Sequence, residues 1–294
     1  MKRKTWFWIL AVLITFSAAI YQRMTGPTYE KEVRFEIEDK KYVTNLPRST
    51  NGTDSCAIKL EIPASVKGVL FYKRYPTNEE WQSTVFRESK DGQVAYLPGQ
   101  PPAGKLQYYI GLRSGKKIIY IARNDPLIIR FKGEVPNGIL IPHVLVMFLA
   151  MLFSTVAGLY ALGKLSNYKI YGYITLILLI IGGFILGPTM QYYAFGDPWT
   201  GIPFGWDLTD NKTLIAFIGW VTAVVSNRRK YRPRHYIVAA ALLLVVYSIP
   251  HSLLGSEYDF EKGEVITGLV SLLMVLLPQY FTGQVLPKKQ EFDR

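Results

Sequence analysis

Apolar residues along the chain form long uninterrupted runs, separated near the N-terminus by a stretch of short alternating ones. The long runs cover residues 6–22, 139–162, 170–192, 208–226, 236–254 and 265–285. Each is close to the ~20 residues that an α-helix needs to cross the hydrocarbon core of a bilayer. The pattern therefore predicts a polytopic α-helical membrane protein with about six transmembrane helices.

Residues 23–138, between the first two long runs, have a different pattern. Short alternating runs occur at residues 33–37, 58–62, 69–72, 81–86, 106–112, 117–122 and 127–131. Turn signals such as Asn51-Gly52 separate many of them. This spacing is typical of an all-β sandwich of the immunoglobulin-like or fibronectin-III-like type, in which Tyr108 is a candidate corner tyrosine.

The expected domain order is an N-terminal anchor at 1–22, the β-sandwich at 23–138, a five-helix membrane domain at 139–285 and a tail at 286–294. Residues 1–21 also resemble a signal peptide, with Ser17-Ala18-Ala19 as a cleavage site. We favour an uncleaved anchor, because the run is strongly apolar. The single cysteine, Cys56, cannot form an intramolecular disulfide and is expected to be a small buried residue.

The net charge of +12 is mainly a topology signal. The segments 1–5, 163–169, 227–235 and 286–294 hold thirteen Lys and Arg and two acids, whereas the connections after the third and fifth runs hold two Lys and seven acids. Because cytoplasmic loops carry the excess of Lys and Arg, both termini are expected in the cytoplasm of a bacterial inner-membrane protein. The β-sandwich and the acidic connections then face outward. No nucleic-acid binding is expected.

The connection between the third and fourth runs carries more chemistry than a turn needs. It reads FGDPWTGIPFGWDLTDNKTLI and contains Trp199, Trp206, Asp207 and Asp210. The following run is strongly apolar only from residue 214, so Asp210 falls in the first helical turns, where a polar side chain should point into the bundle. Asp207 is well placed to cap that helix.

The three histidines differ in their expected positions. His235 lies at the cytoplasmic edge, whereas His143 and His251 each follow a proline in oppositely directed runs and fall at similar depth on the outer side. Two neutral imidazoles on facing helices can hold a haem iron from both axial sides. Hydrogen bonding to backbone carbonyls freed near the prolines is the alternative.

This combination resembles the haem-handling membrane proteins of cytochrome c maturation, whose outer loop reads roughly W-G-x-x-W-x-W-D between two haem-ligating histidines. Phe195-Gly196, Trp199 and Trp206-Asp207 stand at the corresponding places, with six residues between the two tryptophans where the family has one. The resemblance covers the membrane half. It implies that His143 and His251 ligate haem, and that Trp199, Trp206 and Asp207 form its platform. We expect the cofactor to be haem b and count Asp210 among the candidate cofactor-binding residues.

The leading hypothesis is therefore a membrane haem-binding protein, acting in haem handling for cytochrome assembly or in electron transfer. The alternative is a membrane-anchored scaffold or assembly factor whose β-sandwich docks an extracytoplasmic protein partner. A third hypothesis is a metal-binding or transport protein that uses the outer acids Asp197, Asp207, Asp210, Glu257, Asp259, Glu261 and Glu264. Hydrolase activity is not expected, because no Ser/His or Cys/His pair is visible beyond the adjacent His251-Ser252.

Overall fold

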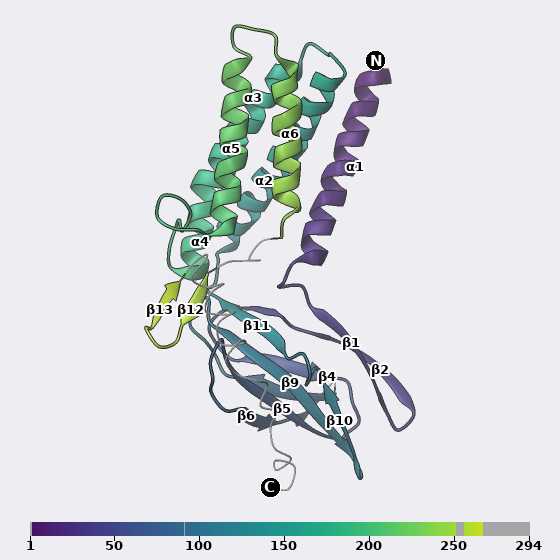
Figure 1. Ribbon diagram of the computed structural model, residues 1–294. Helices are drawn as coiled ribbons and strands as arrows, with labels where there is room; N and C mark the ends of the chain where they lie inside the picture. Colours follow the sequence, from purple (N-terminus) through teal and green to yellow (C-terminus); the bar gives the residue numbers. More distant parts are fainter. Residues whose placement is uncertain (1, 91, 251–255, 267–294) are drawn as a thin grey trace. The chain divides into compact units, whose positions relative to one another are not determined.

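The computed structural model describes residues 2–90, 92–250 and 256–266. They form two compact units, a helical one from Met1–Pro27 and Glu134–Gly255, and a β-rich one from Thr28–Gly133 and the described part of Ser256–Arg294 (Figure 1). The predicted combination of membrane helices with a separate β-domain is confirmed at this level.

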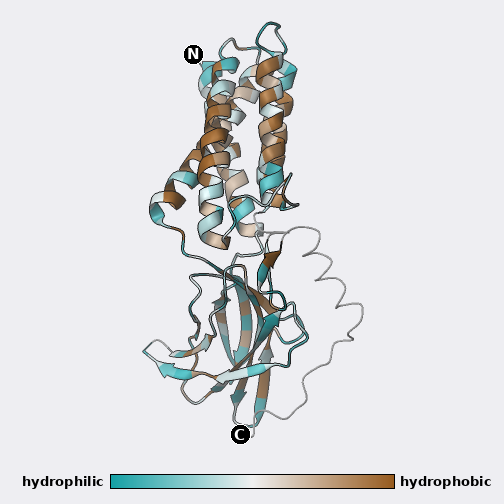
Figure 2. Ribbon diagram, turned by 90° about the vertical axis from the view of Figure 1, so that its left-hand side faces the viewer, coloured by the Kyte–Doolittle hydropathy of each residue, from teal (hydrophilic) through white to brown (hydrophobic). Residues whose placement is uncertain are grey.

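The described part of the helical unit contains five helical segments, and the third segment consists of three consecutive helices. The helices are α1 (Lys2–Thr25), α2 (Asn137–Leu162), α3 (Tyr168–Leu179), η1 (Ile180–Leu186), α4 (Gly187–Phe195), α5 (Leu208–Ser226) and α6 (Pro233–Ser248). Figure 1 shows α2, α3, α5 and α6 side by side. Figure 2 shows hydrophobic residues along most of the length of these helices, whereas hydrophobic and hydrophilic residues are mixed along the strands.

Within the described residues, three helices are long and apolar enough to cross a membrane: Lys2–Thr25, Asn137–Leu162 and Tyr168–Phe195. Helix α6 is apolar but shorter, ending at Ser248 instead of the expected residue 254. The expected sixth run begins in a strand, Glu264–Ile266, and its remaining residues lie outside the described part of the chain. A count of six spans stays a prediction.

Small residues let the helices approach closely. A Cβ added at Gly158 of α2 would lie 2.6 Å from the Cβ of Ala240 in α6. A Cβ at Gly172 of α3 would lie 2.1 Å from the ring of Tyr236 and 2.9 Å from that of Trp220. These two rings meet edge to face with centroids 5.4 Å apart. Packing of this kind replaces the hydrophobic driving force that is missing between helices in lipid.

The third helical segment is interrupted by the π-helical segment η1, Ile180–Leu186. Pro188 follows it at the start of α4, and proline cannot donate the hydrogen bond that an uninterrupted α-helix would require there. The wider turn instead lets the N–H of Gly187 bond to the carbonyl of Gly182. The helix thus accommodates Pro188 through a π-helical turn.

The described part of the β-rich unit has a six-stranded and a three-stranded sheet around one core, and two separate two-stranded hairpins. Its strands are β1 (Lys31–Ile37), β2 (Lys40–Leu46), β3 (Ser49–Asn51), β4 (Cys56–Leu60), β5 (Lys67–Tyr75), β6 (Gln82–Val85), β7 (Arg87–Ser89), β8 (Gly92–Leu97), β9 (Lys105–Ser114), β10 (Lys117–Ile121) and β11 (Leu127–Lys132). A six-stranded sheet has the order β3-β11-β9-β5-β6, with β10 also paired to β9. A three-stranded sheet, β4-β8-β7, packs on it through residues such as Ile58, Leu97, Leu70 and Ile110.

All seven alternating runs read from the sequence lie on strands, but β2, β3, β7 and β8 were not among them. Strand β2 reads KKYVTNL and pairs with β1 as an outlying hairpin with few buried positions, so its apolar signal is weak. Tyr108 is buried, and its hydroxyl donates to the carbonyl of Pro47 across 2.7 Å. This bond reaches 61 residues back along the chain, so Tyr108 does not form the local corner that was expected.

A short acidic hairpin, β12 (Glu257–Asp259) with β13 (Glu264–Ile266), also belongs to the β-rich unit. Lys105 of β9 forms an ion pair with Glu257, and Arg130 of β11 donates to the carbonyl of Ser256. The backbone N–H of Tyr258 donates to the carbonyl of Ala103 at 3.3 Å. The acidic connection after the fifth run is therefore a structural part of the sandwich.

Candidate functional site

The imidazole of His143, the first predicted haem ligand, is held by backbone. Its Nδ1 lies 3.1 Å from the carbonyl oxygen of Gly182, in the π-helical segment η1. A carbonyl oxygen only accepts hydrogen bonds, so Nδ1 carries the proton and Nε2 keeps a lone pair. A neutral imidazole with a fixed tautomer is able to bind a metal through Nε2.

Four elements converge near His143. A Cβ added at Gly182 would lie 2.5 Å from the Sδ of Met147, which is one turn beyond His143 on α2. The hydroxyl of Tyr247 on α6 donates to the same sulfur across 3.3 Å. A Cβ at Gly183 would meet the methyl group of Thr213 on α5 at 2.8 Å. Helices α2, α5 and α6 thus close around η1 at this level.

Asp207, a predicted platform residue, caps α5. Its Oδ1 accepts hydrogen bonds from the backbone N–H of Thr209 at 2.7 Å and of Asp210 at 3.2 Å. The residue is 3% exposed. The predicted cap is confirmed, and the carboxylate satisfies two N–H groups that the first helical turn leaves without partners.

Asp210 is buried, as expected, but its carboxylate serves the loop. Oδ2 accepts from the backbone N–H of Thr200 at 2.6 Å, the hydroxyl of Thr200 at 3.2 Å and Nε2 of Gln191 at 3.1 Å. Next to it, Oδ1 of Asn211 accepts from the backbone N–H of Ile202 at 2.7 Å. These residues set the shape of the loop instead of presenting free oxygens to a ligand.

The two tryptophans of the loop have different environments. Trp199 stacks on Phe184 of η1, with ring centroids 5.5 Å apart, and its Nε1 donates to the carbonyl of Ile202. Trp206 is 67% exposed and its neighbour Phe204 is 82% exposed. Trp199 therefore fixes the loop to η1, whereas Trp206 and Phe204 present aromatic surface.

Lys212 links α5 to the end of α6. The side chain is 4% exposed and donates to the carbonyl of Ile249 across 2.7 Å. Ile249 follows the last residue of α6 in extended conformation. The second predicted ligand, His251, comes two residues later in the sequence and lies outside the described residues.

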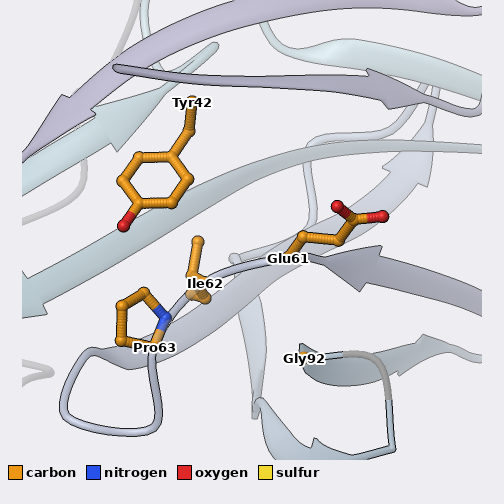
Figure 3. A pocket seen from close by; sticks show the side chains of 5 residues that line it. All are labelled: Tyr42, Glu61, Ile62, Pro63 and Gly92. Atoms are coloured by element: carbon orange, nitrogen blue, oxygen red, sulfur yellow. The ribbon is translucent and has the colours of Figure 1, made fainter. Parts of the chain in front are cut away.

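The described residues do not form the metal site of the third hypothesis. Across the described part of the chain, no three His, Cys, Asp or Glu side chains gather closely enough to hold a metal ion. Asp259 instead accepts the backbone N–H groups of Glu261 and Lys262 in the turn of its hairpin. A hollow of about 580 Å³ in the sandwich is lined by Tyr42, Glu61, Ile62, Pro63 and Gly92. In Figure 3 the carboxylate of Glu61 points away from the hydroxyl of Tyr42.

Several residues that shape the site carried no clear signal in the sequence. Gly182 has no side chain that could indicate a role, although its carbonyl holds His143. Gln191 and Thr200 are common polar residues, and their roles depend on the fold that brings them to Asp210.

The function of this chain has to be inferred from its own residues. No model of a known protein family matches the chain, and no curated protein matches it.

Proposed function

We propose that the helical unit binds haem, with His143 as one axial ligand. The observation that carries this proposal is the hydrogen bond between His143 Nδ1 and the carbonyl of Gly182. Metal-ligating histidines almost always donate their other ring N–H to a carboxylate, a carbonyl or water, which fixes the tautomer and the ring orientation. The described residues thus fit an imidazole ligand that offers Nε2 to iron.

His251 is the proposed second ligand, on the basis of the sequence. Lys212 supports this choice, because its hydrogen bond to Ile249 anchors the backbone two residues before His251. The π-helical segment η1 adds support of a different kind, since single π-helical turns inside helices occur frequently at functional sites.

The loop after α4 would supply the aromatic part of the site. Trp206 and Phe204 expose ring surface on which a planar porphyrin can stack. Asp207 and Asp210 act indirectly, because their carboxylates hold the start of α5 and the loop in place. Bound haem would add reversible electron transfer at the iron, and the surrounding apolar helices would keep water away.

The proposal includes a membrane setting. We assign the chain to a bacterial inner membrane, with about six spans, both termini in the cytoplasm and the sandwich outside. The three long apolar helices and the bias of Lys and Arg support this assignment. The two-sheet core supports an immunoglobulin-like or fibronectin-III-like class for the sandwich.

The test is an absorption spectrum of the full chain purified in mild detergent, before and after titration with haemin. We expect a Soret band that His143→Ala and His251→Ala each shift or abolish. His235→Ala is the matched control, because His235 is the one histidine of the chain that is not a proposed ligand, and it lies at the start of α6. It should leave the spectrum unchanged.

Two results would reject the proposal. The first is a protein that is folded by circular dichroism but shows no Soret band after titration with haemin. The second is a band that His143→Ala and His251→Ala leave as it is in the wild-type chain.

A further inference from the structure

One face of the six-stranded sheet is basic. Paired residues on neighbouring strands share a face, so the register places Phe71, Tyr109 and Arg113 on the side opposite the buried core residues Leu70 and Ile110. The charged residues at strand positions on this side are Lys67, Lys73, Lys105, Arg113, Arg130 and Lys132. Among the described strand residues, no Asp or Glu occupies this side, which we name the basic face.

Aromatic rings lie between these charges. Phe71 and Tyr109 stack at 4.7 Å, and Trp81 meets Tyr109 edge to face at the same centroid distance. Lys73 Nζ lies 5.4 Å from the ring centre of Trp81. Tyr120, which follows at 6.3 Å from Tyr109, is 37% exposed. Phe71 and Tyr109 are themselves buried, so the rings of this cluster that solvent reaches are Tyr120 and the half-buried Trp81.

Beyond Tyr120 the surface is hollowed. The guanidinium of Arg123 lies 4.2 Å from the ring centre of Tyr120. Both residues line a hollow of about 550 Å³, together with Ala122, Asn124 and Asp125. A side chain that enters this hollow would meet an aromatic ring and a cation together.

The chain itself shows what kind of segment this surface accepts. At one end of the basic face, the acidic hairpin is bound through the ion pair of Lys105 with Glu257 and the hydrogen bond from Arg130 to Ser256. Phe260 of the same hairpin makes a cation–π contact with Arg74 at 5.1 Å, although Arg74 pairs with Leu106 and so lies on the other side of β5. The bound segment reads EYDFE from Glu257, so acidic and aromatic residues alternate in it.

We propose that the remainder of the basic face binds an extended, acidic segment with aromatic residues, supplied by an extracytoplasmic partner protein. Charge complementarity selects the acidic residues, since the charged strand positions of this face are all cationic. Tyr120 and Trp81 would receive the aromatic residues through ring contacts like those that they make with Tyr109. The proposal is independent of haem binding, because the residues that carry it all belong to the β-rich unit.

The experiment measures binding of a fluorescent peptide, GEYDFEG, to the full chain in detergent by fluorescence anisotropy. Two peptide controls separate charge from aromatic content: GQYNFQG lacks the charges and GEADAEG lacks the rings. The test variant is Lys73→Glu with Arg123→Glu. Its matched control is Lys41→Glu with Lys59→Glu, which makes the same charge change at exposed positions on β2 and β4.

We expect saturable binding of GEYDFEG that weakens as salt is added. Lys73→Glu with Arg123→Glu should weaken it about tenfold or more, whereas the control pair should leave it nearly unchanged. Tyr120→Ala keeps the charges and should also weaken it. Both control peptides should bind more weakly than GEYDFEG.

The proposal is overturned if GEYDFEG does not bind saturably, or if the test and control pairs weaken binding equally. It is also overturned if anionic lipid vesicles or heparin bind through Lys73 and Arg123 while the peptide does not, because the surface would then recognise a polyanion. Circular dichroism of each variant establishes that it is folded before binding is scored.

Discussion

The backbone N–H of Thr200 donates to Oδ2 of Asp210 across 2.6 Å, which joins the loop after α4 to the first turn of α5. Gly201 makes this approach possible, since a Cβ there would lie only 2.6 Å from the Cβ of Asp210. The carboxylate of Asp210 and the tight turn beside it are therefore among the main contacts that hold the loop carrying Trp199 and Trp206. This arrangement makes the loop sensitive to single substitutions.

Asp210→Ala should destabilise the loop strongly. The substitution leaves the N–H of Thr200 and the amide of Gln191 without their acceptor, which costs about 2 kcal/mol for groups shielded from water. We expect a lower unfolding temperature in detergent and faster proteolysis within residues 196–206. Asp197→Ala removes an exposed carboxylate of the same loop and serves as control. Equal proteolysis of the two variants would contradict the assigned role.

Asp207 should be replaceable by another capping residue. Asp207→Ala removes the acceptor of two N–H groups at the start of α5 and should cost about 1 kcal/mol. Asp207→Ser retains a side-chain oxygen and should recover most of that loss. The thermal unfolding of both variants checks this order. If serine destabilises as much as alanine, the charge of Asp207 matters more than its cap.

Gly182→Ala should disturb the contact between η1 and α2. The added Cβ would lie 2.5 Å from the Sδ of Met147, so the helices must separate or the methionine must move, at a cost of about 1–3 kcal/mol. The unfolding temperature should fall. Gly138→Ala, in the first turn of α2, meets open space and should have little effect. A Gly182→Ala protein as stable as this control would mean that the contact is loose.

The ion pair between Lys105 and Glu257 should show strong coupling. Its side chains are 17% and 5% exposed. Burial lowers the pKa of Lys105, and the charge of Glu257 raises it in opposition, so the lysine depends on its partner to stay charged. Lys105→Met or Glu257→Leu alone should cost about 3 kcal/mol, because each leaves one buried charge without its partner.

The double variant should cost less than the sum of the two single ones. Hydrogen exchange at β9, followed by mass spectrometry, measures these losses as local opening free energies. The control removes the exposed ion pair of Arg34 and Glu32, which should change the local opening free energies at β9 by less than about 0.5 kcal/mol. Additive losses at Lys105 and Glu257 would mean that the two charges do not support each other.

Cys56 should react slowly with thiol reagents in the folded protein. The residue is 9% exposed, and burial raises the pKa of its thiol, so the reactive thiolate is scarcer at pH 8 than in an exposed cysteine. Alkylation should accelerate greatly in denaturant. A cysteine placed at exposed Ser65 in a Cys56→Ala chain gives the rate without protection. Similar rates at both positions would contradict the burial of Cys56.

Elements with a strong apolar period could be predicted from the sequence, and elements set by long-range contacts could not. The run at 139–162 became α2, Asn137–Leu162, because a continuous apolar stretch of that length leaves few other structures. The strand β8, GQVAYL, has a short mixed sequence and acquires its structure from pairing with β4 and β7. The hairpin after Ser256 was not among the predicted strands, because its basic partners are far away in the sequence.

In the candidate site too, roles that follow from local sequence could be predicted and roles that depend on long-range contacts could not. The cap at Asp207 follows from a local rule about helix starts and was predicted correctly. The acceptor of His143 could not be predicted, because the carbonyl of Gly182 is 39 residues away and is brought there by the packing of η1 on α2. Whether Asp210 faced a ligand or its own loop depended on Thr200 and Gln191, whose positions only the fold determines.

The return of the chain to the sandwich has a consequence for the order of biosynthesis. Lys105 and Glu257 are 152 residues apart, and Arg130 and Ser256 are 126 apart. Between the two ends the ribosome makes helices α2 to α6, which takes on the order of ten seconds at typical translation rates. Until Ser256–Asp259 emerges, Lys105 and Arg130 have no hairpin to bind. The sandwich must therefore wait, with part of its basic face uncovered, until helices α2 to α6 have been made.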